Sequence, residues 1–175
     1  MHNPATPAAY EQGAGCTGTP TLAHYLKLLE AAFLASGLEL FSRGRQRKRG
    51  SSPKLVLWNN ALVNALSTRN FTDALGDTIW WGRLVENAVG GHLCNSLNSV
   101  EYTVTYWRER DHEVDFVVAR GNDIWAIEVK SGRSAKTSGL SRFRARYPEA
   151  RALLAGGPGI PLADFFSRDA GDWLV

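Results

Sequence analysis

Residues 113–132 read EVDFVVARGNDIWAIEVKSG, two apolar runs on either side of a short polar loop. Gly, Asn and Asp between runs of β-branched and aromatic residues predict a β-hairpin. If residues 120–123 form the loop, antiparallel pairing sets Ala119 opposite Ile124. The same register extends back along both strands and decides which side chains share a face of the sheet.

That register places four charged side chains on one face: Glu113, Asp115, Glu128 and Lys130. Asp115 is expected opposite Glu128, and Glu113 opposite Lys130, where it would fix the ammonium. Carboxylates directly opposite each other repel, and partial burial increases the cost. A Mg²⁺ ion between Asp115 and Glu128 would offset that cost, because hard cations bind carboxylate oxygens. Lys130 beside the metal would stabilise developing negative charge.

A solvated sheet face is the alternative explanation, because charges that face water need no special function. The charged face, however, is apolar away from its charges, with Val117, Ala119, Ile124 and Ala126. The opposite face is expected to carry Val114, Phe116, Val118, Trp125, Ile127 and Val129. A fully solvated face would be more polar than this, so the pattern favours a metal site.

Composition indicates a globular protein of one domain or slightly more, because the chain has 175 residues, 44% hydrophobic, with six Trp. No apolar run is long enough to cross a bilayer, and residues 1–18 lack a secretion signal. Neither Cys16 and Cys94 nor the four histidines have a metal-ligand spacing, so zinc is not expected. We expect a cytoplasmic protein with no membrane partner.

The segment 19–76 is expected to be helical and winged-helix-like. Residues 1–18, rich in Ala, Pro, Gly and Thr, are interpreted as a disordered or remnant tail. A helix begins at residues 19–21 and ends near Gly37, followed by strands at 38–41 and 54–58. A helix and a hairpin with a long tip look like the recognition helix and wing of a partial winged-helix unit.

The hairpin tip is strongly basic, and basic clusters bind nucleic-acid phosphates by releasing counterions. The chain has a net charge of +3, but its positive residues are clustered here and near residue 140. The candidate DNA-binding residues are Arg43, Arg45, Arg47, Lys48, Arg49, Lys136 and Arg142. A solvated loop without a partner is the alternative, since most charge runs have no binding role.

Residues 77–175 are expected to form a separate α/β domain. A helix capped by Asn59 or Asn60 and a loop at 69–73 precede it. Within it, the pattern predicts a long helix at 79–97, a three-stranded meander that begins at 101–107, a helix from 138, a strand at 151–155 and a last turn of helix at 163–167.

Two residue types in the long helix are unusual. Glu86 lies beside its apolar stripe, where a surface glutamate is the common explanation and a supporting acid the functional one. Gly90 and Gly91 each cost about 1 kcal/mol inside a helix, and close approach to the sheet would explain them.

The order helix, three-stranded meander, helix, strand resembles the PD-(D/E)XK nuclease fold. The residues that carry its motif stand in the same order: Glu86, Asp115, Glu128 and Lys130. The resemblance implies that Asp115 and Glu128 bind Mg²⁺, that Lys130 is the catalytic lysine and that Glu86 is a supporting acid.

Five phrases also resemble one family, in the same order. They are TLAHYLKLLE at 21–30, SPKL at 52–55, GRLVEN at 82–87, EVDF at 113–116 and EVKS at 128–131. The family is the uncharacterised C-terminal domain of bacterial and archaeal AAA-type ATPases, and the resemblance covers residues 19–167. It implies a separate ATPase subunit as partner, because this sequence contains no Gly-x-x-x-x-Gly-Lys-Ser/Thr phosphate loop and should not hydrolyse ATP. Residues 59–61 depart from the family, which tends to have an Asp and a Gly there.

Two functions remain open at this stage. One is a Mg²⁺-dependent DNA nuclease that uses the acids and lysine of the hairpin. The other is a non-catalytic module that binds DNA or a protein partner, in which the carboxylates form a structural ion-pair network with Lys130.

Overall fold

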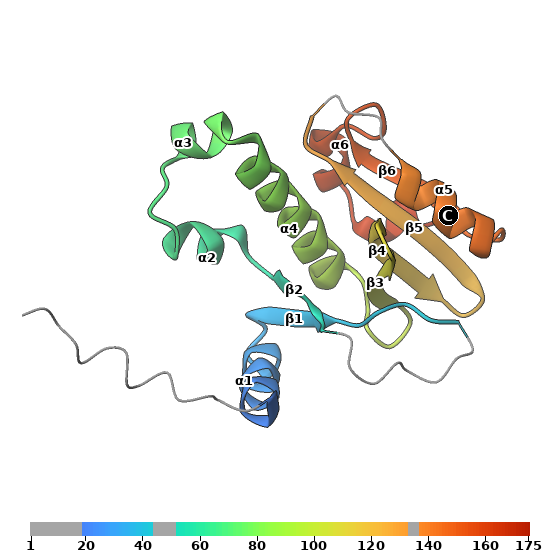
Figure 1. Ribbon diagram of the computed structural model, residues 1–175, viewed down its shortest axis with the longest axis horizontal. Helices are drawn as coiled ribbons and strands as arrows, with labels where there is room; N and C mark the ends of the chain where they lie inside the picture. The colour runs from blue at the N-terminus through green and yellow to red at the C-terminus, as the bar shows by residue number, and fades with distance from the viewer. Residues whose placement is uncertain (1–18, 44–51, 133–136) are drawn as a thin grey trace, which may run out of the picture.

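The computed structural model describes residues 19–43, 52–132 and 137–175 of the chain (Figure 1). Within these ranges it is a mixed α/β structure with two sheets and six α-helices. The helices are α1 (Thr19–Ala31), α2 (Asn60–Ala65), α3 (Phe71–Gly76), α4 (Thr78–Ser96), α5 (Ser138–Arg146), α6 (Leu162–Phe166) and the 3-10 helix η1 (Ala170–Trp173). The strands are β1 (Ala35–Leu38), β2 (Lys54–Leu57), β3 (Thr103–Glu109), β4 (His112–Arg120), β5 (Asp123–Lys130) and β6 (Arg151–Gly156).

The larger sheet has the strand order β3-β4-β5-β6, with β5 and β6 parallel and the other pairs antiparallel. The predicted order of a long helix, a three-stranded meander, a helix and a strand is therefore confirmed. The hairpin register is confirmed too, because Ala119 pairs with Ile124 and Arg120 with Asp123.

Helices cover both faces of this sheet (Figure 1). On one face Val89 and Leu93 of α4 pack with Phe116 and Trp125, and all four are nearly inaccessible to solvent. On the other face the fully buried Phe143 of α5 packs in a second cluster of apolar side chains from β3, β4 and β5. Two helices on an apolar sheet give three layers, which explains why β5 is apolar on both faces.

Strand β4 contains a bulge that the alternation of polar and apolar residues does not predict. Thr105 pairs with Val117 but Trp107 pairs with Val114, so two steps along β3 match three along β4. The extra residue reverses the alternation. Val114 therefore packs with the α5 cluster and not, as predicted, on the face of Phe116.

Gly90 and Gly91 lie where α4 touches the strands, as the sequence predicted. A Cβ on Gly90 would stand 2.8 Å from the Phe116 ring, and one on Gly91 would stand 3.1 Å from the Leu57 and Trp58 carbonyl oxygens. The absence of a side chain thus sets how closely the helix approaches its neighbours.

Replacing Gly90 with Ala should lower the free energy of unfolding by about 2 kcal/mol, because the methyl group overpacks the contact with Phe116. Gly82→Ala on the same helix is the control, since its Cβ would meet only Ser131 Oγ at 3.5 Å. That change should stabilise the protein by up to about 1 kcal/mol through helix propensity. Urea unfolding of both variants checks the pair, and shifts of the same sign would contradict the packing argument.

The N-terminal half differs from the prediction in three places. Helix α1 ends at Ala31, six residues before Gly37, which lies inside β1 and donates its N–H to Glu30 Oε1 at 2.9 Å. The predicted strand at 38–41 is shifted back to β1, paired with β2. The predicted loop at 69–73 is instead the start of α3, because Asn70 and Asp73 form a capping box.

The C-terminus of α1 is closed by Phe33. The Phe33 N–H donates to the Glu30 carbonyl and the Leu34 N–H to the Leu29 carbonyl, both at 3.0 Å. This is a Schellman motif, which requires a left-handed residue and usually takes glycine. Phe33 occupies it with a φ of 55°.

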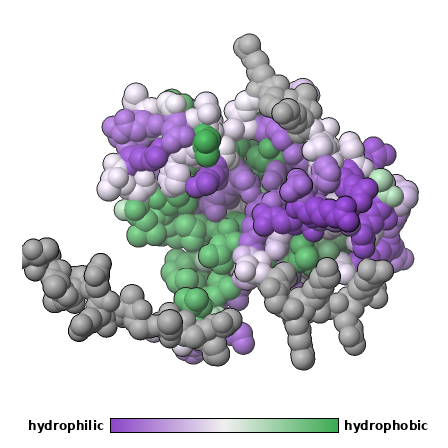
Figure 2. Space-filling view, in the orientation of Figure 1, coloured by the Kyte–Doolittle hydropathy of each residue, from purple (hydrophilic) through white to green (hydrophobic). Residues whose placement is uncertain are grey.

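Helix α1 exposes apolar side chains. Leu22, Tyr25, Leu28 and Leu29 are each 44% to 61% accessible, and Figure 2 shows hydrophobic surface over this helix. A groove of about 980 Å³ runs from α1 past Leu55 and Trp80 to Lys54 and Glu86. No helix in the described ranges is both long and apolar enough to span a membrane.

Candidate metal centre and nucleic-acid interface

Asp115 lies at the β4 bulge, where β4 and β5 separate. The regular pairing of the two strands stops at Phe116 with Ile127, one pair before Asp115 and Glu128. The Val129 N–H donates instead to Asp115 Oδ2 at 2.8 Å. The carboxylate thus replaces a backbone acceptor, and bulges commonly re-aim side chains in this way beside functional sites.

A lysine from β2 occupies the space among three carboxylates. Lys54 Nζ lies 2.5 Å from Glu86 Oε1, 3.3 Å from Glu113 Oε1 and 3.7 Å from Asp115 Oδ1. It also donates to the Asp115 carbonyl oxygen at 3.1 Å and lies 5.0 Å from the centre of the Phe116 ring. We call Lys54, Glu86, Glu113 and Asp115 the ion cage.

The ion cage joins distant parts of the chain. Lys54 comes from the small sheet, Glu86 from α4, and Glu113 and Asp115 from the start of β4. The second oxygen of Glu113 binds Arg108 of β3, with Nη2 at 2.5 Å and Nε at 3.0 Å. Each acid is therefore oriented by a cation that comes from an element other than its own.

Glu128 and Lys130 form a separate pair at the end of β5. Lys130 Nζ lies 2.8 Å from Glu128 Oε1, whereas Glu128 Oε2 is buried and has no hydrogen-bond partner in the described structure. Gly139 makes room beside it, because a Cβ there would stand 3.4 Å from Glu128 Oε2 and 1.8 Å from the Glu113 carbonyl oxygen. A buried carboxylate oxygen without a donor is costly, and it is the atom most in need of a cation.

The pKa shifts of Asp115 and Lys54 reflect both their burial and the charges around them. Burial, and then the negative charge of Glu86, raise the pKa of Asp115 to about 6, although Lys54 opposes this. Burial alone would lower the pKa of Lys54, but Glu86, Asp115 and Glu113 outweigh it and raise this pKa above its ordinary value. The attraction of Lys54 therefore does not offset the burial of Asp115 and its repulsion by Glu86.

These residues fit a divalent cation only in part. In the described ranges, no three side chains of Asp, Glu, His or Cys converge closely enough to hold a metal ion by themselves. Mg²⁺, however, usually keeps several waters and uses one or two carboxylates. Glu128 Oε2 is unpartnered and Asp115 is poorly compensated, so these two predicted ligands are the chemically suitable ones.

The structure corrects two expectations about the four charged residues of the hairpin. Glu113 does not pair with Lys130; its cationic partners are Lys54 and Arg108, and Lys130 binds Glu128. The four side chains do not share one face either. The bulge at Asp115 shifts the alternation of β4, so Glu113 joins the ion cage while Glu128 lies near α5.

The predicted DNA-binding residues are described only in part. Arg45, Arg47, Lys48, Arg49 and Lys136 lie outside the described residues. Arg43 pairs with Glu149 across the exposed surface. Arg142 and Arg146 of α5 both bind Glu109, at 2.9 Å and 2.7 Å. These arginines are about half exposed and would have to share or leave their acids to reach a phosphate.

Sequence reasoning missed Lys54 as a member of the site. Its local signals are its place in the phrase SPKL at 52–55 and the fact that it is the one charged residue at the start of an otherwise apolar strand, residues 54–58. Such a lysine is usually a solvated strand end. Its position among three acids depends on packing of the small sheet against α4, which no local pattern of residues encodes.

Two family models match the chain in separate regions. Residues 81–159 match DUF4143 and residues 5–73 match DUF8612, each described as a domain of unknown function. Each match covers less than half of the chain. The searches of curated proteins and of solved structures found no match. The first match contains Glu86, Asp115, Glu128 and Lys130, and the second contains Lys54.

Proposed function

We propose that this protein binds DNA and cleaves phosphodiester bonds at a site of the PD-(D/E)XK nuclease type. One observation carries the proposal: a buried Glu128 oxygen without a donor lies on the strand next to an Asp115 carboxyl whose pKa is raised to about 6. Raised carboxyl pKa values combined with specific charged partners are typical of functional sites. The order of elements and the DUF4143 match over residues 81–159 are compatible with the resemblance that suggested this activity.

Asp115 and Glu128 would hold the divalent cation. When bound, Mg²⁺ would polarise the scissile phosphate and lower the pKa of an attacking water. Asp115 is fixed by the Val129 N–H, so its carboxylate is already oriented. Glu128 holds the Lys130 ammonium at 2.8 Å, from where Lys130 would neutralise charge that develops on the phosphate. Glu86 acts indirectly, because its partner is Lys54.

DNA is the proposed substrate because the protein is basic, with a sequence pI of about 9.0. Arginines of α5 and the basic segment 43–49 would contact the phosphate backbone, which positions a duplex without reading its sequence. A separate ATPase subunit is a further proposed partner, and it rests on the family resemblance alone.

Cleavage of plasmid DNA in Mg²⁺ or Mn²⁺, with EDTA as the blank, tests the proposal. Lys130→Met should reduce the cleavage rate about a hundredfold, the usual effect of losing one electrostatic stabiliser. Lys27→Met, at an exposed lysine of α1, should leave the rate unchanged. Equal rates for wild type and Lys130→Met would reject the assigned role.

A non-catalytic DNA-binding module is the second candidate. It is favoured by the ion cage itself, in which Lys54 already provides three carboxylates with a cation. A shift of DNA in a gel without cleavage in any divalent metal would support this alternative.

A further inference from the structure

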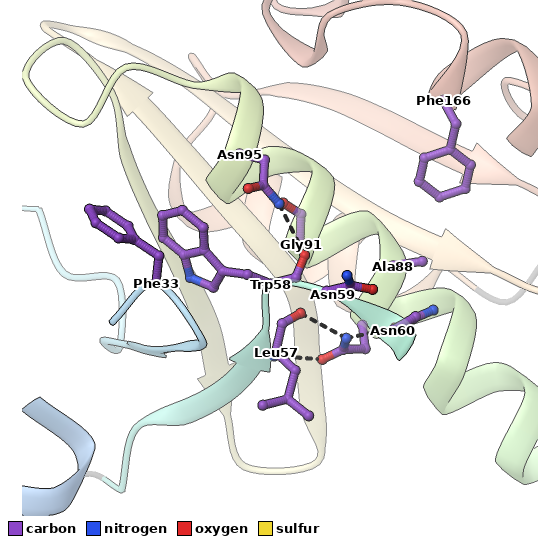
Figure 3. A pocket seen from close by; sticks show the side chains of 10 residues that line it. Phe33, Leu57, Trp58, Asn59, Asn60, Ala88, Gly91, Asn95 and Phe166 are labelled. Atoms are coloured by element: carbon purple, nitrogen blue, oxygen red, sulfur yellow. Dashed lines mark hydrogen bonds between the residues drawn. The ribbon is translucent and has the colours of Figure 1, made fainter. Parts of the chain in front are cut away.

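A hollow of about 510 Å³ lies beside α4, at the end of β2 (Figure 3). Small residues of α4 form part of its lining, and aromatic rings and carboxamides surround them. The side chains that matter for its chemistry are Phe33, Trp58, Asn59, Ala88, Asn95 and Phe166. In Figure 3, Phe33 and Trp58 lie side by side, and Phe166 lies apart from them beyond Ala88.

Phe33 lines this hollow in a left-handed backbone conformation that phenylalanine rarely adopts. It occupies the left-handed position that closes α1, where glycine has the lowest cost. Phe33 is nevertheless 68% exposed, so burial in the core does not explain the choice of residue. A bulky residue at positive φ with an exposed ring points to a role for the ring itself.

Trp58 gives the hollow a fixed aromatic wall. Its indole N–H donates to Ser36 Oγ at 2.7 Å, and its ring lies 5.4 Å from the Phe33 ring in an edge arrangement. The indole orientation is therefore set before any ligand arrives. Fixed aromatic surfaces are what nucleic-acid-binding proteins use to stack unpaired bases.

Two of the nearby carboxamides, those of Asn87 and Asn60, form hydrogen bonds within the protein. Asn87 accepts from the Leu57 N–H and donates to the Leu57 carbonyl, both at 2.9 Å, and donates to Asn60 Oδ1 at 2.7 Å. These bonds attach the end of β2 to α4, and the dashed lines near Leu57 in Figure 3 belong to this attachment. Neither amide is available for a ligand without loss of that attachment.

The other two carboxamides each keep one polar group available. Asn59 uses Oδ1 to cap α2, and its Nδ2 has no partner among the described residues. Asn95 uses Nδ2 to bind the Trp58 and Gly91 carbonyls, at 3.0 Å and 2.8 Å, and its Oδ1 has none there either. The hollow therefore offers one donor and one acceptor beside its aromatic wall, the combination that the edge of a nucleobase requires.

We infer that this hollow binds an unstacked nucleobase of a single-stranded nucleic acid. The inference rests on the proposed nucleic-acid function and narrows its substrate to strands with unpaired bases. The base stacks on the Phe33 and Trp58 surface while its edge contacts Asn59 and Asn95. Leu57, which lines the hollow, and Lys54 of the ion cage are three residues apart on β2, about 10 Å at the rise of a strand, so the hollow lies near the ion cage.

Titration with an oligothymidylate about ten nucleotides long, followed by Trp fluorescence and by anisotropy of the labelled strand, tests the inference. All measurements use EDTA, so that cleavage plays no part. Phe33→Gly should keep the fold, because glycine favours the left-handed cap, yet weaken binding at least about fivefold. Phe71→Ala is the matched control, since Phe71 is also exposed and its ring lies 6.2 Å from the Trp81 ring in the same edge arrangement, away from the hollow.

Equal affinities of wild type and Phe33→Gly would overturn the inference, as would equal losses in Phe33→Gly and Phe71→Ala. Thymidine monophosphate forms the second arm. If it competes with the oligonucleotide at comparable concentration, the site recognises a free nucleotide and the single-strand assignment is wrong. Because the titration is carried out in EDTA and does not depend on cleavage, failure of the cleavage proposal and failure of this inference give different results.

Discussion

Asp115→Asn should abolish metal-dependent DNA cleavage and, at the same time, make the protein more stable at neutral pH. The pKa of Asp115 is raised from 3.8 to about 6, so the folded protein binds this proton more tightly than the unfolded chain does. The stability linked to the proton is fully present below about pH 4 and is lost as the pH rises through 6. Each unit of pKa shift corresponds to about 1.4 kcal/mol.

Asn cannot ionise, and its Oδ1 can still accept from the Val129 N–H. We therefore expect Asp115→Asn to unfold with a free energy about 2 kcal/mol higher than wild type at pH 7, after allowance for its lost attraction to Lys54. The difference should shrink toward pH 4. Urea unfolding at several pH values measures it, and a difference that does not depend on pH would contradict the assigned charge balance.

The loss of cleavage has a distinct cause. Asp115 is a proposed ligand of the divalent cation, and a neutral amide is a poor replacement for a carboxylate at Mg²⁺. Plasmid cleavage should fall below detection while the variant remains folded. A folded, more stable and inactive variant would separate the catalytic role of Asp115 from any role in holding the fold, and unchanged cleavage would reject the metal site.

Lys54→Met should have the opposite effect on stability. The Lys54 side chain is only 16% exposed and faces three carboxylates. Loss of one partner from a buried ion pair typically costs 3–5 kcal/mol, because the remaining charges stay uncompensated. We expect a loss of about 3 kcal/mol at pH 7, measured by urea unfolding. Lys27→Met on the surface of α1 is the control and should change stability by less than about 0.5 kcal/mol.

Two conditions should rescue Lys54→Met. Lowering the pH toward 5 protonates Asp115, whose pKa is already raised to about 6 and rises further once the ammonium is gone, so stability should recover there. Millimolar Ca²⁺ or Mg²⁺ should also raise the melting temperature of the variant more than that of wild type, because the ion takes the place of Lys54. A variant as stable as wild type at pH 7 would show that the ion cage contributes little.

The sequence predicted the central hairpin because its information is local. Apolar alternation and the Gly-Asn-Asp loop define the Ala119–Ile124 register, and helical periodicity places α4 around Glu86. The faces of β4 were predicted correctly only on the loop side of the bulge. Val114 and Glu113 lie beyond it, and their orientation depends on one extra residue whose position the alternation of polar and apolar residues does not reveal.

The remaining errors have non-local causes. Lys54 enters the site through packing of β2 on α4, although the helices α2 and α3 separate these two elements along the chain. Phe33 closes α1 at a position that glycine usually takes. The sequence therefore predicts the end of the helix at Gly37 instead. For Lys54 a tertiary contact, and not local preference, decides the structure, and at Phe33 the residue present has a lower preference for the backbone conformation than glycine has.

The ion cage also bears on how the two halves of the chain depend on each other. One family model matches the half that provides the lysine, and the other matches the half that provides the acids. Val56, beside Lys54 on β2, is also buried in the core formed by α4 and the larger sheet. A fragment that begins at α4 would keep its carboxylates but lose Lys54, the cation that they share, and would expose part of its interior, so the two regions form an interdependent pair rather than interchangeable modules.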